Sequence, residues 1–342
     1  MELEDLSIVE KAAMLSGGSE WDSRGNDRAD IPGFVMSDGP HGVRRQLGEG
    51  DHLGIGASKP ATCFPTACTV ANTWDPALAE EMGEALGKEA HDLDVNVLLG
   101  PGMNIKRNPL CGRNFEYYSE DGVLAAAQVN AMATKGTYNY IKHFALNDQE
   151  TNRCAFLLTY SNEQAIREIY LKPFELCIKN FDGTQIAVMS SFNWIGTVPA
   201  CANEDTLTTI LRNEWGFQGM VITDYDGSYG YMITDHCVRT GNDLMLGFSS
   251  QASNQLTNTE SATLNNALRT SCKNIMYTIA NSGYYTNTTD DSGMSNMTKL
   301  FVTIDVVTVL LVVLCMALVI VRYRKKHAKT AAEVTPEEKK EE

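Results

Sequence analysis

The alternation of strand-like and helical patterns is the feature of this sequence that most restricts its fold. Between Met1 and about Gly283, short apolar runs each end in a polar or glycine-rich loop, and helical patterns fill the gaps between them. Such an alternation is typical of a parallel sheet with helical connections. Over this length it predicts an α/β fold of the (β/α)8 TIM-barrel type. The runs begin at Gly33, Asn96, Asn139, Gln185, Gly219 and Asp243.

Signals for four helices lie between or after these runs, namely three helix starts and one apolar stripe. Asp75-Pro76 combines a capping carboxylate with a proline, which fits the first turn of a helix. Ser161 and Asn203 are predicted to cap two further helices. The last helix carries an apolar stripe formed by Leu264, Leu268, Cys272, Ile275 and Ile279.

The C-terminal part predicts a membrane anchor. Residues 299–321 are almost wholly apolar and long enough to cross a hydrocarbon core, and a basic flank follows them. The alternative is a buried core helix. We therefore expect a barrel domain over 1–285, a juxtamembrane linker over 286–298, a transmembrane helix over 299–321 and a charged cytoplasmic tail over 322–342.

This topology predicts a single-pass cell-membrane protein whose barrel domain is extracytoplasmic. The N-terminus has neither the basic nor the apolar segment of an export signal. Either the apolar helix itself directs export, or an upstream piece of the chain carries the signal.

Charge and cysteine content exclude two classes of function. The formal net charge of −15 argues against a nucleic-acid partner, because such a protein needs a basic face to neutralise phosphates. The nine cysteines form no CxxC pair, so neither a zinc site nor a tight disulfide framework is expected. No metal and no cofactor are predicted.

Polar residues follow several of the predicted strands. Asp224 ends the run that begins at Gly219, and Asp38, Arg113, Lys142 and His143 lie at or just past other strand ends. In a barrel these ends meet on one face. A capping role explains a single aspartate after a strand, but not all five residues together. Two acids, a guanidinium, an ammonium and an imidazole predict a multi-donor pocket suited to a sugar, with Asp224 as the nucleophile.

The motifs around these residues resemble glycoside hydrolase family 3, in its β-glucosidase and β-xylosidase branch. They occur in family order across nearly the whole of residues 1–285. The matching segments are Met36-Ser-Asp38-Gly-Pro-His-Gly, Gly112-Arg113-Asn-Phe-Glu116, Lys142-His143-Phe-Ala-Leu-Asn147-Asp-Gln-Glu150, Met189-Ser-Ser-Phe-Asn193 and Glu214-Trp215-Gly-Phe-Gln-Gly-Met-Val-Ile-Thr-Asp224.

The resemblance implies roles for individual residues. Asp224 matches the nucleophile that forms a covalent glycosyl-enzyme with retention of configuration. Asp38, Arg113, Lys142 and His143 match residues that bind the sugar hydroxyls. Met189 and Tyr225 are expected to form walls of the pocket. Glu150 and Arg153 look like supporting residues, and a structural ion pair with Arg113 is the alternative for Glu116.

The main departure from the family is the general acid/base. In this branch it is a glutamate on a separate α/β sandwich domain, whereas here a linker and an apolar helix follow the barrel. The chain resembles the barrel half of a member with swapped domain order. We expect a retaining β-glycosidase that cleaves terminal non-reducing β-linked sugars with a sandwich domain as partner. The alternative is a non-catalytic sugar-binding or remnant membrane protein.

Overall fold

The chain divides into two units, Met1–Thr288 and Thr289–Glu342, which are described separately. The linker expected over 286–298 lies largely outside the described residues, whereas the tail expected over 322–342 is described as far as residue 333. The computed structural model describes residues 3–48, 50–51, 53–120, 128–129, 131–132, 135–155, 157–180, 185–226, 232–247, 256–285 and 296–333.

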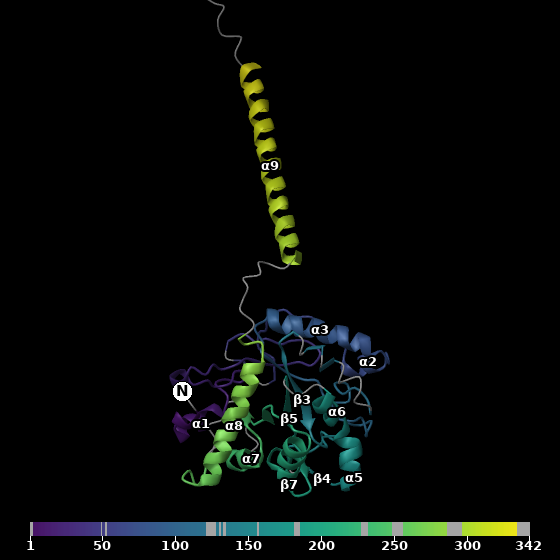
Figure 1. Cartoon of the computed structure of the whole chain (residues 1–342). Helices are drawn as coiled ribbons and strands as arrows, with labels where there is room; N and C mark the ends of the chain where they lie inside the picture. The colour runs from purple at the N-terminus through teal and green to yellow at the C-terminus, as the bar shows by residue number, and fades with distance from the viewer. Residues whose placement is uncertain are drawn as a thin grey trace, which may run out of the picture. The chain divides into compact units, whose positions relative to one another are not determined.

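The first unit is built on a sheet of six parallel strands in the order β1-β2-β3-β5-β8-β9 (Figure 1). Each strand coincides with one of the six runs predicted from the sequence. A small second sheet, β4-β6-β7, combines β4, which precedes β5 along the chain, with β6 and β7, which follow β5. The strands are β1 (Met36–Asp38), β2 (Val97–Leu99), β3 (Tyr138–Phe144), β4 (Leu158–Thr159), β5 (Ile186–Ser190), β6 (Trp194–Ile195), β7 (Val198–Pro199), β8 (Val221–Tyr225) and β9 (Leu244–Leu246).

The predicted eight-stranded barrel is wrong, because the main sheet is open and curled. In the described part of the chain β1 and β9 are its two edges and do not pair with each other. The N-terminal segment reaches both edges instead. Ser16 forms an isolated bridge with Met245 in β9, and Asp22 bridges Val35 next to β1. The backbone groups of the two edges therefore find partners in an irregular segment rather than in further strands.

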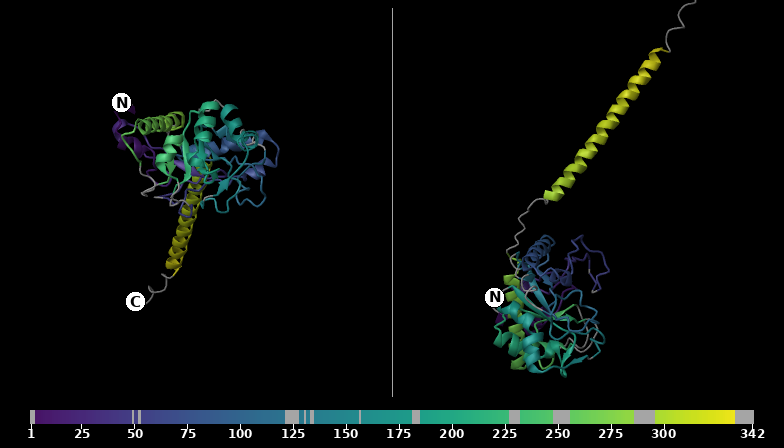
Figure 2. Two further views of the ribbon diagram at one scale, coloured as in Figure 1. Left: turned by 90° about the horizontal axis from the view of Figure 1, so that it is seen from below. Right: turned by 90° about the vertical axis from the view of Figure 1, so that its right-hand side faces the viewer.

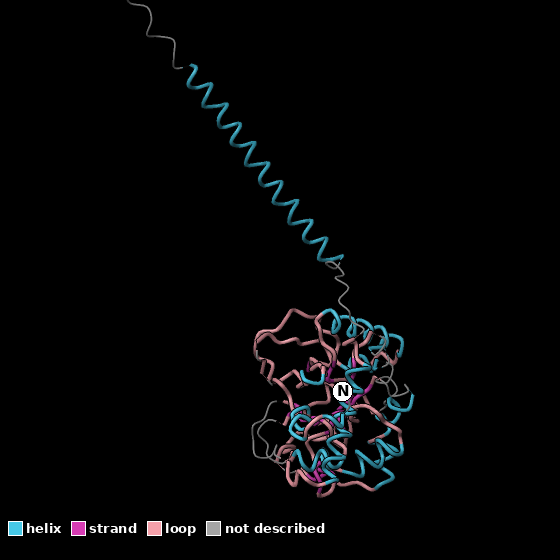
Figure 3. Tube along the Cα trace, turned by 60° about the vertical axis from the view of Figure 1, so that its left-hand side comes forward, coloured by secondary structure: helices cyan, strands magenta, loops and turns pink. Residues whose placement is uncertain are grey.

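Helices cover both faces of this sheet (Figures 1 and 2). Helices α1, α7 and α8 gather on one flank, and α5 and α6 lie on the other. Figure 3 shows long loop segments beside the helices and strands. Among the described residues from 39 to 66 there is no helix or strand. The helices of this unit are η1 (Leu3–Asp5), α1 (Ile8–Met14), η2 (Asp27–Ala29), α2 (Ala67–Ala71), α3 (Pro76–Asp92), α5 (Glu163–Ala165), η3 (Ile166–Tyr170), α6 (Lys172–Asn180), η4 (Ala200–Ala202), η5 (Asp205–Glu214), α7 (Thr234–Thr240) and α8 (Ala262–Asn281).

Alternate residues of the strands enter two separate cores. In β5, Val188 packs with Phe174 of α6 and Leu211 of η5, whereas Met189 belongs to the core that contains Leu268 of α8. Successive side chains of a strand point to opposite faces, so a sheet buried on both sides needs apolar residues at every position. All five residues of β5 are buried, as this requires.

The helix caps predicted from the sequence are confirmed in part. The Asp75 carboxylate caps α3 by accepting a hydrogen bond from the backbone N–H of Ala77 at 2.9 Å, and Pro76 begins the helix. Asn203 caps the first turn of η5 through Thr206. The cap predicted at Ser161 is wrong by one residue, because Asn162 accepts the capping bond from Ala165. All five residues of the stripe predicted for the last helix are buried in α8.

The second unit contains α9 (Asn296–Glu333), and the predicted transmembrane helix within it is wrong. In the described part of the chain, no helix is both long and apolar enough to cross a membrane. The predicted cell-membrane location, with an extracytoplasmic barrel and a cytoplasmic tail, depended on this span and is wrong as well.

Candidate active site

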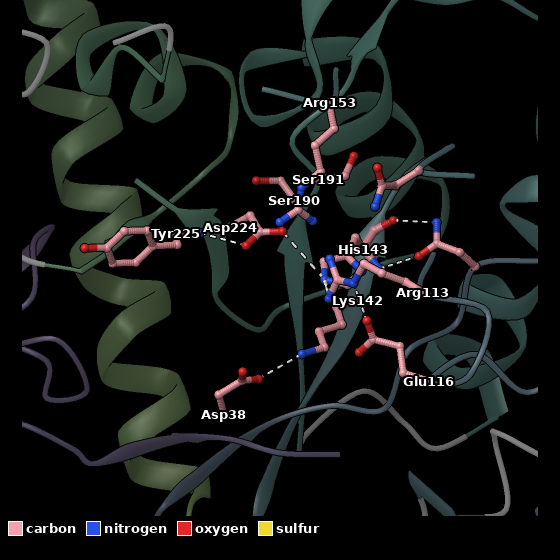
Figure 4. Close-up of polar contacts among 12 residues, drawn as sticks. Asp38, Arg113, Glu116, Lys142, His143, Arg153, Ser190, Ser191, Asp224 and Tyr225 are labelled. Atoms are coloured by element: carbon pink, nitrogen blue, oxygen red, sulfur yellow. Dashed lines mark hydrogen bonds and ion pairs between the residues drawn. The ribbon is translucent and has the colours of Figure 1, made fainter. Parts of the chain in front are cut away.

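All seven residues predicted for the site line one pocket at the carboxyl ends of the strands. Figure 4 labels six of them, all except Met189. The pocket has a volume of about 230 Å³. Asp38 ends β1, Lys142 and His143 lie in the last three residues of β3, and Asp224 lies at the end of β8. The fold thus brings together predicted side chains from positions up to 187 residues apart. The lining residues predicted from sequence are Asp38, Arg113, Lys142, His143, Met189, Asp224 and Tyr225.

The two carboxylate oxygens of Asp224 have different surroundings. Oδ1 accepts a hydrogen bond from the backbone N–H of Tyr225 at 2.8 Å. Oδ2 is buried and accepts no hydrogen bond from the described residues. Its neighbour is the Nε2 atom of His143, at 3.6 Å. Burial raises the pKa of Asp224 above its usual value, although Arg113 and Arg153 favour the ionised form. Asp224 Oδ2 is therefore a buried carboxylate oxygen without a hydrogen bond to the described residues.

The hydrogen bonds of His143 fix its protonation state. Its Nε2 lies 2.9 Å from Arg113 Nη2, and its Nδ1 lies 2.9 Å from the Tyr117 hydroxyl. A guanidinium only donates, so Nε2 must be the accepting nitrogen and Nδ1 carries the proton. Burial lowers the pKa of His143 well below its usual value, and Arg113 and Lys142 lower it further. The imidazole is thus neutral and leaves Asp224 without a formal ion pair.

Arg113 and the backbone around β3 hold the histidine in place. Arg113 Nε forms a very short ion pair with Glu116, which is buried and does not line the pocket. The alternative considered for Glu116, a structural ion pair, matches this contact. The Asn104 side chain accepts from the His143 backbone N–H at 2.7 Å and donates to its carbonyl at 2.9 Å. These contacts leave His143 little rotational freedom.

Asp38 and Lys142 form the second charged pair of the pocket. Lys142 Nζ donates to Asp38 Oδ1 at 3.0 Å, and the lysine is 3% exposed. Burial disfavours the ionised form of Asp38, but Lys142 and Arg44 outweigh it and keep its pKa below the usual value. Asp38 is therefore a carboxylate that accepts hydrogen bonds, while Lys142 retains donors for a ligand.

Met189 and Tyr225 form walls of the pocket. Met189 is buried in β5, and Tyr225 donates a long hydrogen bond of 3.4 Å to Glu20. The Tyr225 ring lies against the backbone of Gly247, where an added Cβ would approach Cε2 within 2.9 Å. Gly247 also has a φ of +98°, a conformation that glycine adopts without strain.

The structure adds six lining residues to the predicted set. Arg153 was expected only as a supporting residue, yet it lines the pocket, pairs with Glu150 at 2.9 Å and lies 4.4 Å from the Phe192 ring. Trp21 belongs to the irregular segment between the two sheet edges, so no periodic pattern pointed to it. The added residues are Trp21, Leu53, Leu99, Arg153, Phe192 and Leu246.

The next question is whether the site could hold a metal ion. In the part of the chain that the structure describes, no group of three or more His, Cys, Asp or Glu side chains is arranged to hold a metal ion.

A parallel α/β fold with acids and donors gathered at its strand ends defines a class of protein. It is the class in which a carboxylate-containing pocket receives a polyhydroxylated ligand, as glycoside-cleaving enzymes do. Residues 10–254 match the model of the glycosyl hydrolase family 3 N terminal domain. The chain belongs to this family.

Relatives and solved structures agree with that assignment. The chain is 42% identical over 235 residues to an exo-alpha-(1->6)-L-arabinopyranosidase of Bifidobacterium breve, which covers 66% of this chain and 30% of the relative. It is 40% identical over 227 residues to thermostable beta-glucosidase B of Acetivibrio thermocellus, with 65% and 30% covered. The structure of beta-glucosidase 3B from Thermotoga neapolitana in complex with glucose gives a TM-score of 0.71 at 33% identity, covering 83% of this chain and 43% of that one.

The relatives are much longer than the region they share with this chain. The matched region spans about a third of the length of the curated relatives named above. The similarity therefore covers the part that carries the pocket described here.

Proposed function

We propose that the chain is the nucleophile-bearing part of a retaining β-glycosidase that acts on β-glucosides. In this mechanism Asp224 Oδ2 attacks the anomeric carbon, the bond to the leaving oxygen breaks, and a glycosyl-Asp224 ester forms. Water then hydrolyses the ester and restores the configuration at the anomeric carbon. We extend the proposal to the domain limits, with the glycosidase part over 1–285.

The observation that carries this proposal is the free Oδ2 of a buried aspartate. Asp224 Oδ2 accepts no hydrogen bond from the described residues, so its lone pairs are available for attack, while Oδ1 is anchored to the backbone. Burial raises the free energy of the anion, and attack on a cationic centre relieves it. The neutral His143 beside it does not neutralise Asp224 by ion pairing.

The other polar residues of the pocket fit the binding of sugar hydroxyls. Lys142, Arg113 and Arg153 are donors, and the Asp38 carboxylate is an acceptor. Hydrogen bonds to charged groups are stronger than neutral ones and can tighten as charge develops in the transition state. We assign Asp38, Arg113, Lys142 and His143 to the sugar nearest the cleaved bond, with Met189 and Tyr225 as walls.

Protonation of the leaving oxygen requires a second acid. The only acidic residues that line the described pocket are Asp38 and Asp224, and Lys142 holds Asp38 as a carboxylate. We therefore propose that a separate α/β sandwich domain supplies the acid/base glutamate. This pairing makes the activity of the chain alone depend on the leaving group.

The lack of an available acid in the described pocket also favours one alternative, a sugar-binding protein without turnover. A pocket with donors and no available acid can bind a glycoside and leave it intact. The two functions differ in whether Asp224 forms a bond with the sugar, so the experiment must detect that bond.

The test compares two aryl β-glucosides with the full chain. 2,4-Dinitrophenyl β-glucoside has a leaving group that needs no protonation, whereas phenyl β-glucoside needs an acid. We expect release of dinitrophenol by the wild type, little release of phenol, and loss of both in Asp224→Ala. Sodium azide should restore turnover of the dinitrophenyl substrate by Asp224→Ala and yield α-glucosyl azide, because the small anion enters the space of the carboxylate.

The control is Asp38→Ala, which removes a pocket carboxylate without removing the attacking oxygen. It should weaken turnover, and azide should not change its product. Wild-type binding of the dinitrophenyl glucoside without any release of dinitrophenol, in a folded chain, would leave the sugar-binding alternative.

A further inference from the structure

A second and larger pocket lies beside the small sheet, away from the residues assigned above. It has a volume of about 590 Å³, within the range of roughly 300–1,000 Å³ that small-molecule sites occupy. Its walls come from β4, the β6–β7 turn and the helical segments α5, η3 and η5. We call it the β6–β7 pocket. It shares one short segment with the candidate active site, since Phe192 lines that pocket and Ile195 lines this one.

The chemistry of the β6–β7 pocket is that of a neutral, hydroxyl-rich ligand. Its aliphatic lining comes from Ile166, Ile195, Val198 and Ile210, and hydroxyl side chains surround them. The one arginine, Arg167, is already paired with Glu163 and Glu214. No free cation is therefore left among the described lining residues to recognise an anion.

Several exposed polar side chains of this pocket form no hydrogen bond with the described residues. The hydroxyls of Tyr160, Thr197 and Thr209 and the carboxylate of Asp205 form no hydrogen bond within the described part of the chain. Tyr160 is 68% exposed, so its ring offers an open aromatic face. An aromatic face beside unpaired donors and acceptors fits the apolar face and the hydroxyl groups of a pyranose ring.

The backbone of two walls supplies an independent observation. Both η3 and η5 are π-helical, and both contribute lining residues. π-Helical turns make up well under 1% of residues and are frequently found at functional sites. Two of them around one pocket would be an unusual feature of a purely structural surface.

We propose that the β6–β7 pocket is a second saccharide-binding site of this chain. Tyr160 stacks on one face of a pyranose ring, and Thr197, Thr209 and Asp205 bind its hydroxyl groups. The site holds sugar without reacting with it, and its occupation does not depend on Asp224 acting as a nucleophile.

The test measures binding of cellotetraose by isothermal titration calorimetry to the full chain carrying Asp224→Asn, so that the probe stays intact. Tyr160→Ala and Thr209→Trp are then added separately, the first to remove the stacking face and the second to fill the pocket. We expect each to abolish one binding event or weaken it at least tenfold. Tyr285→Ala is the matched control, because Tyr285 is a similarly exposed aromatic, 57% exposed, outside the pocket.

The outcome is independent of the proposed function. A binding event that Tyr160→Ala and Thr209→Trp remove, and that Tyr285→Ala keeps, supports the second site even if Asp224 proves inactive. Unchanged binding in both pocket variants, or no cellotetraose binding at all, overturns it. In the chain with native Asp224, Tyr160→Ala should leave the release of dinitrophenol unchanged, since Tyr160 does not line the active-site pocket.

Discussion

At the scale of single residues, the pair formed by Asp38 and Lys142 carries a definite expectation. Lys142 is buried, so loss of its carboxylate partner leaves an uncompensated ammonium that no longer orients its donors. A hydrogen bond to a charged group contributes about 1.5–3 kcal/mol. We predict that Asp38→Asn raises KM for 2,4-dinitrophenyl β-glucoside by roughly tenfold to a hundredfold, as measured by steady-state kinetics.

The control for this prediction is an exposed pair of the same residue types. Lys88 and Asp92 lie 2.5 Å apart on the surface of α3, with side chains more than half exposed. Asp92→Asn should change neither KM nor stability measurably, because exposed pairs contribute little. Equal effects of the two substitutions would contradict the assigned role of Asp38.

Gly247 carries a second expectation at this scale. An alanine there meets the Tyr225 ring at 2.9 Å and must adopt a φ of +98°. We predict that Gly247→Ala lowers the free energy of unfolding by about 1–3 kcal/mol and raises KM because the ring is displaced. Urea unfolding and steady-state kinetics measure the two effects.

Gly216→Ala separates the two causes. Gly216 has a φ of +74°, but an added Cβ would meet no atom within 4 Å. Gly216→Ala should therefore lower the free energy of unfolding through backbone strain alone and leave KM unchanged. A KM increase in Gly216→Ala as large as in Gly247→Ala would argue against displacement of the Tyr225 ring as the cause.

Some residues of the site could be predicted from the sequence pattern around them, and others could not. Asp224, Lys142 and His143 could be found because each follows an apolar run, and a strand end is a local pattern. Trp21 and Leu53 could not, because they lie in segments without periodicity and reach the pocket through tertiary contacts alone. Arg153 was underestimated for the same reason, since the loop after β3 has no regular geometry to extrapolate.

At the scale of elements, the start of α3 is the clearest case of a sequence signal that determines structure. The Asp75 carboxylate accepts from Ala77 N–H at 2.9 Å and lies near Leu78 N–H at 3.4 Å. Loss of such a cap costs about 0.5–2 kcal/mol. We predict that Asp75→Ala lowers the free energy of unfolding by about 1 kcal/mol and leaves KM unchanged, as measured by urea unfolding and kinetics.

Asp75→Asn is the control, because asparagine also caps helices well. It should keep most of the stability. If Asp75→Asn loses as much as Asp75→Ala, the negative charge near the helix start, and not the capping hydrogen bond, is the main contribution.

Element positions followed from sequence wherever the signal lay within the element itself. The six strands of the main sheet and the stripe of α8 were read from their own periodicity. The cap at Asn162 was misplaced to Ser161 because serine and asparagine are both good caps and adjacent here, so only the hydrogen bond distinguishes them. The two-residue strands β4, β6 and β7 are too short for any periodic signal.

At the scale of the whole molecule, closure of the sheet could not be read from the sequence. Six strand runs were named, and a barrel was inferred from their alternation, but alternation is equally compatible with an open parallel sheet. The edges are joined instead by isolated bridges from the segment around Ser16 and Asp22, which carries no strand pattern. The predicted transmembrane helix is also wrong. In the described part of the chain no helix is both long and apolar enough to cross a membrane.

Buried acids make the stability of the whole fold depend on pH, and Asp148 is the clearest example. Its side chain is 4% exposed, and burial raises its pKa to about 6, although Arg107 lies 3.8 Å away and opposes the shift. The usual value is 3.8, so between these two pH values the native chain holds a proton that the unfolded chain releases. The contribution of Asp148 to stability must therefore fall as pH rises from about 4 to about 6.

The expected size follows from the shift. Each pKa unit corresponds to about 1.4 kcal/mol, so Asp148 lowers the free energy of unfolding by roughly 2–3 kcal/mol at pH 7 relative to pH 4. Asparagine cannot ionise, and we predict that Asp148→Asn is more stable than the wild type by this amount at pH 7 and nearly equal to it at pH 4. Urea unfolding at pH 4, 5, 6 and 7 measures the difference, with the exposed Asp92→Asn as the control that should follow the wild-type curve. Parallel curves for the wild type and Asp148→Asn would mean that Asp148 ionises equally in the folded and unfolded chains, because only a difference in proton binding between them can tilt one curve against the other.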